Sequence, residues 1–219
     1  MQSSILQTLL DSPILPELVE EANKVLVREQ KRRKKFWAEI TDENKWEFIQ
    51  GEVIMHSPAL NRHLLATNRL FSAMETHVRV KELGVVHAQK AMTCFPRNDY
   101  EPDIIFFGPS KTQLIGPDTL RFPIPDLIVE VLSPSTEARD RGIKFQDYAL
   151  HGVQEYWIID PVAESVELHR LTGEVYLPTE RQTEGLLCSD TIAGFEIPVR
   201  AIFDEAENLR VLREIWTGA

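Results

Sequence analysis

The chain has 219 residues, of which 43% are hydrophobic and 26% are charged, values typical of a globular protein with one domain and an added segment. Its formal net charge of −10 counts against a protein that coats nucleic acid, because nonspecific binding depends on Lys and Arg neutralising phosphates. No apolar run approaches the roughly 18 residues of a membrane span, and the first residues lack the basic start of a secretory signal.

Residues 1–40 are expected to form a helical N-terminal extension, followed by a single domain of residues 41–219. The extension contains six basic residues between Arg28 and Lys35, in the stretch "VREQKRRKKF". A solvated helix face is the favoured interpretation of this run. A patch that contacts phosphates and an interaction tail are the alternatives.

A hairpin and a helix open the main domain. Hydrophobicity alternates around Gly51, which predicts a short β-hairpin from Trp46 to Met55 that Pro58 ends. The following segment predicts a helix that stops at Gly84. Its apolar residues recur at steps of three, four or seven, the spacing of one helix face: Leu60, Leu64, Phe71, Met74 and Val78.

Strands dominate the rest of the chain. They are predicted over residues 85–95, 103–108, 126–132 and 154–160, with a hairpin over 165–178 and short strands near 186–187 and 195–197. A helix from Thr136 to Leu150 separates the third strand from the fourth. Its inward face is predicted to consist of Ala138, Phe145, Tyr148 and Ala149.

The order of these elements predicts the fold class. A strand–helix–strand unit implies a parallel pair of strands joined by a crossover, whereas the short link between the first two strands implies an antiparallel pair. We therefore expect an α/β fold with a mixed β-sheet flanked by helices. The two cysteines, Cys94 and Cys188, share no metal-binding spacing, which favours a reducing cytoplasm.

One carboxylate interrupts the apolar strand from Leu127 to Leu132: Glu130. A buried ionised carboxylate is costly unless it meets a hydrogen-bonded partner, a cation or an open cleft. If the strands are neighbours, Asp103 on the preceding strand meets Glu130, and such a pair invites a hard divalent cation such as Mg²⁺ or Mn²⁺. The ion would polarise a phosphate and activate water, with Lys144 on the next helix orienting that water or stabilising charge.

Each of these three residues also has a structural interpretation. Asp103 would cap a turn. Glu130 would pair with an arginine such as Arg139 or Arg141. Lys144 would pair only with Asp140, four residues earlier on one exposed helix face.

Several motifs resemble a known family when they are taken together. They are "WEFIQGEVIMHSP" with the later "NRH", then "EPDIIFF", "IPDLIVEVLSPST" and "RDRGIKFQDYALHGVQEYWIIDP". In this order they resemble the Uma2 family, placed in the PD-(D/E)XK nuclease superfamily with its restriction-endonuclease-like fold. The resemblance covers roughly Trp46 to Phe203, and the predicted order of elements agrees with that fold's common core.

The resemblance implies roles for particular residues. Asp103 matches the first acid of the superfamily motif and Glu130 the second, so both would be catalytic and hold the metal. The motif lysine is expected two residues after Glu130, where this chain has Leu132, and Lys144 would take its place. The Val131 carbonyl would add a metal ligand by the same resemblance. Further candidates for the cleft are Glu47, Glu52, His63 and Lys90.

The function that follows is a metal-dependent endonuclease, a hydrolase of phosphodiester bonds in DNA, with Mg²⁺ or Mn²⁺ as cofactor. A homodimer with no membrane association is expected. The alternative is a noncatalytic descendant of the nuclease fold that binds nucleic acid or protein, which the Leu132 departure and the net charge favour. A third hypothesis is a hydrolase that acts on smaller phosphate esters.

Overall fold

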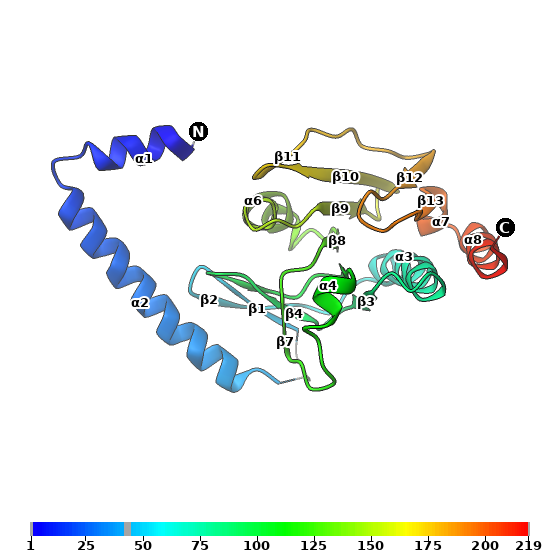
Figure 1. The fold of residues 1–219 in the computed structure, drawn as a ribbon, viewed down its shortest axis with the longest axis horizontal. Helices are drawn as coiled ribbons and strands as arrows, with labels where there is room; N and C mark the ends of the chain where they lie inside the picture. Colours follow the sequence, from blue (N-terminus) through cyan, green and yellow to red (C-terminus); the bar gives the residue numbers. More distant parts are fainter. Residues whose placement is uncertain (1, 42–44, 219) are drawn as a thin grey trace.

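The computed structural model describes residues 2–41 and 45–218. The fold is built around two mixed sheets (Figure 1). The larger has the order β11-β10-β9-β8-β6-β3. Its strands are β3 (Val85–Ala88), β6 (Ile104–Phe107), β8 (Leu127–Val131), β9 (Glu155–Asp160), β10 (Ser165–Thr172) and β11 (Val175–Tyr176).

The larger sheet confirms the predicted mixture of strand directions. β8 and β9 pair in parallel, whereas β3 with β6 and β6 with β8 pair antiparallel. All five residues of β8 are buried, because helices cover both faces of this strand. That explains its continuous apolar sequence, since an alternating pattern belongs to strands with one face in water.

Different helices cover the two faces of the larger sheet. One face packs on α3 (Asn61–Val80), α7 (Arg200–Phe203) and α8 (Glu205–Thr217), through core residues that include Leu70, Ile104, Val129 and Val211. The opposite face packs on the helical segment between β8 and β9, through residues that include Ile105, Ile128 and Tyr148. Neither α7 nor α8 is predicted by the sequence pattern.

The helix predicted from Thr136 to Leu150 forms in three pieces. They are α5 (Glu137–Arg139), a π-helical turn η1 (Asp140–Lys144) and α6 (Phe145–Leu150). Because the turn changes the helical period, the predicted inward face is wrong at Ala138, which is exposed, and right at Tyr148 and Ala149, which are buried. Leu60, predicted on the inward face of α3, is also exposed.

The smaller sheet was not predicted as a separate unit. Its order is β2-β1-β5-β4-β7, from β1 (Trp46–Ile49), β2 (Glu52–Met55), β4 (Met92–Cys94), β5 (Asp99–Tyr100) and β7 (Arg121–Phe122). The strand expected over 85–95 divides at Gln89 and Lys90, whose φ angles of 56° and 53° turn the chain from one sheet into the other. A short helix, α4 (Pro109–Thr112), and a pair of strands, β12 (Leu186–Cys188) and β13 (Glu196–Pro198), complete the fold.

Two helices, α1 (Gln2–Leu10) and α2 (Leu15–Glu39), form an arm that projects from the sheets (Figure 1). The C-terminal half of α2 is fixed to the smaller sheet. Phe36 stacks on Phe48, and the Arg33 guanidinium donates to Asp99 at 2.6 and 2.7 Å. No helix in the described ranges has both the length and the apolar character needed to cross a membrane.

Candidate functional site

Asp103 and Glu130 face each other on adjacent strands. β6 and β8 pair with Ile104 opposite Val129, so the same register, extended by one residue, brings Asp103 opposite Glu130. Side chains alternate along a strand, and both acids therefore point to the sheet face that η1 and α6 cover. The strand pairing on which the metal-site prediction depended is confirmed.

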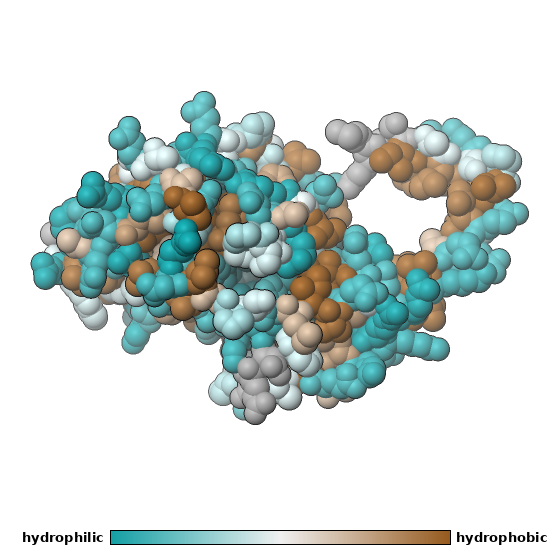
Figure 2. All heavy atoms as spheres, turned by 180° about the vertical axis from the view of Figure 1, so that it is seen from behind, coloured by the Kyte–Doolittle hydropathy of each residue, from teal (hydrophilic) through white to brown (hydrophobic). Residues whose placement is uncertain are grey.

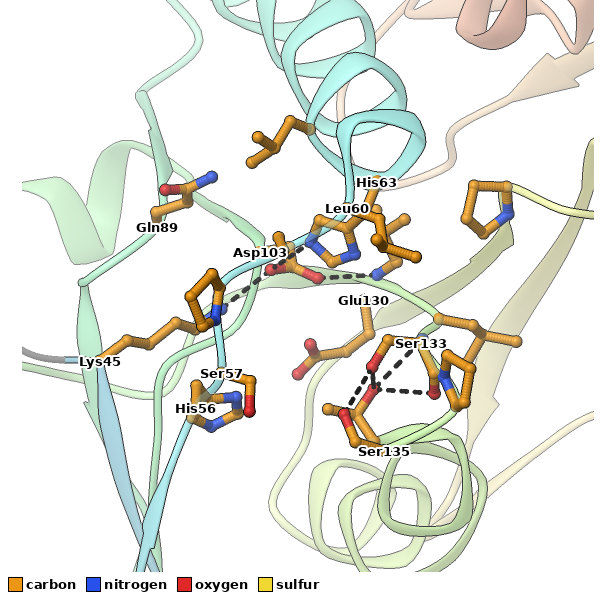
Figure 3. Close-up of a pocket in the computed structure, with 18 of the residues that line it drawn as sticks. Lys45, His56, Ser57, Leu60, His63, Gln89, Asp103, Glu130, Ser133 and Ser135 are labelled. Atoms are coloured by element: carbon orange, nitrogen blue, oxygen red, sulfur yellow. Dashed lines mark hydrogen bonds and ion pairs between the residues drawn. The ribbon is translucent and has the colours of Figure 1, made fainter.

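Asp103 is surrounded by donors. Its Oδ1 lies 2.9 Å from Lys45 Nζ and 3.3 Å from His63 Nε2, and its Oδ2 accepts from the Val131 backbone N–H at 2.9 Å (Figure 3). Burial alone would raise the pKa of Asp103, but Lys45 and His63 outweigh it and hold the pKa below its usual range. Asp103 therefore binds positive charge, and it does not merely cap a turn.

Glu130 has a different environment. Its Oε1 accepts from Lys144 Nζ and from the Tyr148 hydroxyl, each at 2.9 Å. Burial raises the pKa of Glu130 to about 8 despite Lys144, and the nearby carboxylates of Asp140 and Asp103 act in the same direction. An additional cation beside Glu130 would favour its ionised form. The alternative pairing with Arg139 or Arg141 is wrong, since Arg141 binds Glu137 and Glu167 instead.

Lys144 is enclosed by carboxylates. Its Nζ lies 2.9 Å from Glu130, 2.9 Å from Glu47 and 3.2 Å from Asp140, and only 2% of its side chain is exposed. Burial lowers the pKa of Lys144, but the three carboxylates outweigh burial and raise it well above its ordinary value. The interpretation of Lys144 as one half of an exposed pair with Asp140 is therefore wrong.

The π-helical turn and the first hairpin together produce this arrangement. The turn carries Asp140 and Lys144, and β1 carries Glu47, whose Oε2 lies 3.0 Å from His56 Nε2 at the end of the hairpin. Burial would raise the pKa of Glu47, but Lys144 and His56 hold it below its usual range. Three segments far apart in the sequence thus supply one charged cluster.

A cavity of about 790 Å³ opens beside the two acids. Asp103, Glu130, Lys45, His56 and His63 line it, and Figure 3 shows their side chains around one space. Ser133 also lines the cavity. Its hydroxyl lies 3.1 Å from that of Ser135 and 3.0 Å from that of Thr136.

Two arginines add positive charge to the wall of this cavity. Arg62 lies at the start of α3, and Arg139 lies at the end of α5. Among the residues that the structure describes, neither guanidinium forms an ion pair, and the Arg139 Nε atom is buried without a hydrogen-bond partner. Unpaired donors at a concave surface suit an anionic ligand.

Of the remaining candidates from the sequence, two lie in the site and two do not. Glu47 and His63 reach the site, as the sequence had suggested for both. Glu52 lies on the surface and binds Arg32, and Lys90 lies on the exposed turn between β3 and β4, outside the set of described residues that line the cavity. Lys45 and His56 were missed, although they flank the predicted hairpin and their backbones pair at its open end.

The donor atoms of the site fit a hard cation. Asp103 and Glu130 offer carboxylate oxygens to one cavity, and Mg²⁺ is usually held by one or two carboxylates while it keeps several waters. In the described residues no group of three or more His, Cys, Asp or Glu side chains is arranged to hold a metal ion. The set thus suits an ion that retains water and does not suit a closed structural zinc site.

Comparisons with known proteins agree with the resemblance seen in the sequence. Two uncharacterized proteins of Synechocystis are similar: slr1290, 27% identical over 57% of this chain and 65% of its own length, and sll1609, 26% identical over 59% and 74%. The fold matches a crystal structure from Anabaena variabilis, described as "a putative nuclease belonging to DUF820", with a TM-score of 0.67 and 20% identity over 78% of this chain and 96% of that one.

That structural match confirms the nuclease-like α/β fold with its mixed sheet flanked by helices. The comparison with slr1290 spans 65% of that relative's length, just under two thirds. The family model for Uma2, described as "Putative restriction endonuclease", matches residues 34–200, well over half of the chain. This protein belongs to the Uma2 family.

Proposed function

We propose that the protein is a metal-dependent endonuclease that hydrolyses phosphodiester bonds in DNA. The observation that carries the proposal is the meeting of Asp103 and Glu130 across one strand pair, at a cavity whose wall also bears Lys45, Arg62 and Arg139. Membership of the Uma2 family and a nuclease-like fold support hydrolysis of nucleic acid as the general activity. The metal requirement and the choice of DNA are the finer parts of the proposal.

Asp103 and Glu130 would hold Mg²⁺ or Mn²⁺. When bound, such an ion acts as a Lewis acid on a phosphoryl oxygen and lowers the pKa of a coordinated water. His63 and the Val131 N–H orient the Asp103 carboxylate, and Tyr148 orients that of Glu130. Cations already bound to both acids keep the pair compatible with burial before a metal arrives.

Lys144 is the proposed catalytic lysine, and it would stabilise negative charge that develops on the phosphate beside Glu130. Lys45 is a second candidate for the same task. Its ammonium contacts Asp103 at 2.9 Å, and 24% of its side chain is exposed, so it can move into the cavity more easily than Lys144. Either amine would compensate for Leu132 at the usual position of the motif lysine.

Arg62 and Arg139, which form no ion pair within the described ranges, support a nucleic-acid substrate. Arg62 and Arg139 would contact phosphates on either side of the scissile bond, since guanidinium groups bind phosphate oxygens in pairs of hydrogen bonds. The Ser133 and Ser135 hydroxyls offer further donors. This local group of cations reconciles phosphate binding with a net charge of −10, because the charge that matters is the charge at the cavity.

A noncatalytic nucleic-acid-binding or protein-binding role is the second candidate. The observation that favours it is that Lys144 and Lys45 already neutralise both acids in the arrangement described. An ion would have to displace or reorient these ammonium groups. Metal binding therefore separates the two candidates.

The test combines calorimetry with a cleavage assay. We expect Mn²⁺ to bind the wild type, Glu130→Gln to lower that affinity at least about tenfold, and the exposed control Glu174→Gln to retain it. Cleavage of plasmid or single-stranded DNA with Mn²⁺ should follow the same order. Equal Mn²⁺ affinity in the wild type and Glu130→Gln would refute the metal site, and confirmed binding without cleavage would favour the noncatalytic role.

The proposal extends to the organisation of the chain. Residues 41–219 would form a single catalytic domain, with residues 1–40 as an extension, and the protein would work in the cytoplasm as a homodimer. Cys94 and Cys188 are free thiols, which suits a reducing compartment. The boundary after residue 40 adjoins residues 42–44, which lie outside the described ranges.

A further inference from the structure

The N-terminal arm exposes an unusual amount of apolar surface. Every side chain described in α1, from residue 5 to residue 10, is exposed, and the two buried residues of α2, Glu29 and Phe36, lie in its C-terminal half. The exposed apolar side chains of the arm are Ile5, Leu6, Leu9, Leu10, Ile14, Leu18, Val19, Leu26 and Val27. Figure 2 shows apolar side chains gathered along the arm, beside the open space between the arm and the sheets.

Such an arm needs a partner. Helices shorter than about 12–15 residues are marginally stable in water, and α1 has 9 residues and buries none of those described. A contiguous exposed apolar surface usually marks an interaction site. The arm is also held in position, because Glu29 binds Arg97 through two 2.8 Å hydrogen bonds and Trp37 donates to Asp99 at 2.9 Å.

Charge is distributed unequally along α2. Its N-terminal part is mainly acidic, with the exposed acids Glu17, Glu20 and Glu21 and one exposed base, Lys24. Its C-terminal part is mainly basic, with one exposed acid, Glu39, and the exposed bases Arg28, Lys31, Arg32, Lys34 and Lys35. Two copies of α2 side by side in opposite directions would bring acids against bases at both ends. Two copies in the same direction would bring like charges together, which is unfavourable.

We propose that the arm is a dimerisation surface, in which α1 and α2 of one chain pack antiparallel on α1 and α2 of a second copy. A two-fold interface uses the same surface on both subunits, so a helix with opposite charges at its two ends is complementary to itself. Most of the arm, residues 2–33, lies outside the family match, so the family's shared domain does not account for it. A second copy of this chain always carries the same arm. The proposal is independent of the catalytic function.

The first experiment measures the mass of the full chain by analytical ultracentrifugation. We expect a dimer, and we expect Leu18→Glu with Leu26→Glu to raise its dissociation constant at least about tenfold. Leu114→Glu, at a side chain that is 67% exposed outside the arm, is the matched control and should leave the dimer intact. The cooperative thermal unfolding of the core should remain near wild type in all variants, because the substituted side chains are outside the core.

A charge exchange tests the antiparallel arrangement. One variant carries Glu17→Lys, Glu20→Lys and Glu21→Lys, and a second carries Lys31→Glu, Lys34→Glu and Lys35→Glu. Each alone should dimerise more weakly than the wild type, and an equimolar mixture should form a heterodimer, because the exchanged charges then face unexchanged charges of opposite sign at both ends.

Three results would overturn the proposal. The first is a monomeric wild type, whether or not it binds anionic lipid vesicles through the arm. The second is a dimer that the arm substitutions leave unchanged. The third is a mixture of the two charge variants that stays as weakly associated as each variant alone.

Discussion

Removing one ammonium group should have different consequences at Lys144 and at Lys45. Lys144 is buried between Glu47, Glu130 and Asp140, so Lys144→Ala leaves three buried carboxylates without their shared cation. Breaking a buried ion pair in this way typically costs about 3–5 kcal/mol. An exposed pair with Asp140 alone would be worth only about 0.5 kcal/mol.

We therefore predict that Lys144→Ala lowers the free energy of unfolding by about 3 kcal/mol or more. Lys45→Ala should lower it less, because Lys45 is partly exposed and Asp103 keeps its contacts with His63 and the Val131 N–H. Urea unfolding followed by circular dichroism measures both values. Equal losses in the two variants would contradict the enclosed position of Lys144.

A cleavage assay tests which of the two lysines meets the phosphate. If Lys45 is the amine that meets the phosphate, Lys45→Ala should reduce Mn²⁺-dependent cleavage by roughly 10²-fold or more with little change in stability. Arg62→Ala serves as a comparison, since losing a phosphate contact should weaken substrate binding more than the chemical step. Full activity in Lys45→Ala would leave Lys144 as the sole candidate amine.

Which parts of the site could be predicted depended on where each residue lies. Asp103 and Glu130 could be predicted from the sequence. Each begins or occupies a strand with a clear apolar pattern, and the order of the strands made the two residues neighbours. Lys45 and His56 were not, because the hairpin pattern ends between them and only tertiary packing brings its open end to the cavity. The motif spacing pointed to Leu132, whereas the family resemblance suggested Lys144 on the following helix but gave no indication of its burial.

At the scale of elements, Gly84 joins α3 to the edge of the larger sheet. Its φ is +136°, and a Cβ atom at this position would lie 2.0 Å from the Phe107 carbonyl oxygen. The helix ends at Val80 with Lys81 as its C-cap, so this glycine is not the helix stop that the sequence predicted. It is required by the close approach of β6 instead.

We predict that Gly84→Ala lowers the free energy of unfolding by roughly 2 kcal/mol or more, because either the β3–β6 pairing or the turn must shift. Gly142→Ala is the control, since no heavy atom beyond its chain neighbours and its own helix backbone lies within 4 Å of its Cβ position, and we expect that variant to be neutral or slightly more stable. Thermal unfolding of both variants measures the contrast. Similar losses of thermal stability in the two variants would contradict the prediction, because they would show that the backbone around Gly84 can make room for a Cβ atom.

Most elements were predictable, and the exceptions have local causes. The strand expected over 85–95 divides because Gln89 and Lys90 adopt positive φ angles, which no pattern of hydrophobicity reveals. The inward face of the helix after β8 failed at Ala138 because a π-helical turn replaces the usual 3.6-residue period. In both cases tertiary contacts overrule a local preference.

At the scale of the whole molecule, buried histidines link stability to pH. Burial lowers the pKa of His77, His87 and His169 below the ordinary value of 6.5. As the pH falls below 6.5, the unfolded chain takes up protons that the folded chain does not, so this contribution to stability is present above pH 6.5 and lost below it. Glu101 and Glu130, with pKa values of about 7 and about 8, act in the opposite direction.

A single substitution isolates the histidine effect from these opposing groups. His77 donates from Nε2 to the Ala193 carbonyl at 3.0 Å, and Gln at position 77 would keep such a donor without taking up a proton. We predict that the melting temperature of the wild type falls more than that of His77→Gln between pH 7 and about pH 5. Parallel profiles for the two proteins would contradict a lowered pKa at His77.

The π-helical turn Asp140–Lys144 has a genetic consequence. Loss of one codon within this stretch would let the helix close with ordinary hydrogen bonds, so the core contacts of Tyr148 and Ala149 would survive. Residues before the deletion would rotate by about 100° relative to Lys144, because each residue of an α-helix turns the chain by that angle. Arg139 would then leave the cavity wall, and Asp140 would lose its contact with Lys144. A three-nucleotide deletion would thus yield a chain that still folds, and still aligns with its family, but has lost the arrangement on which the proposed chemistry depends.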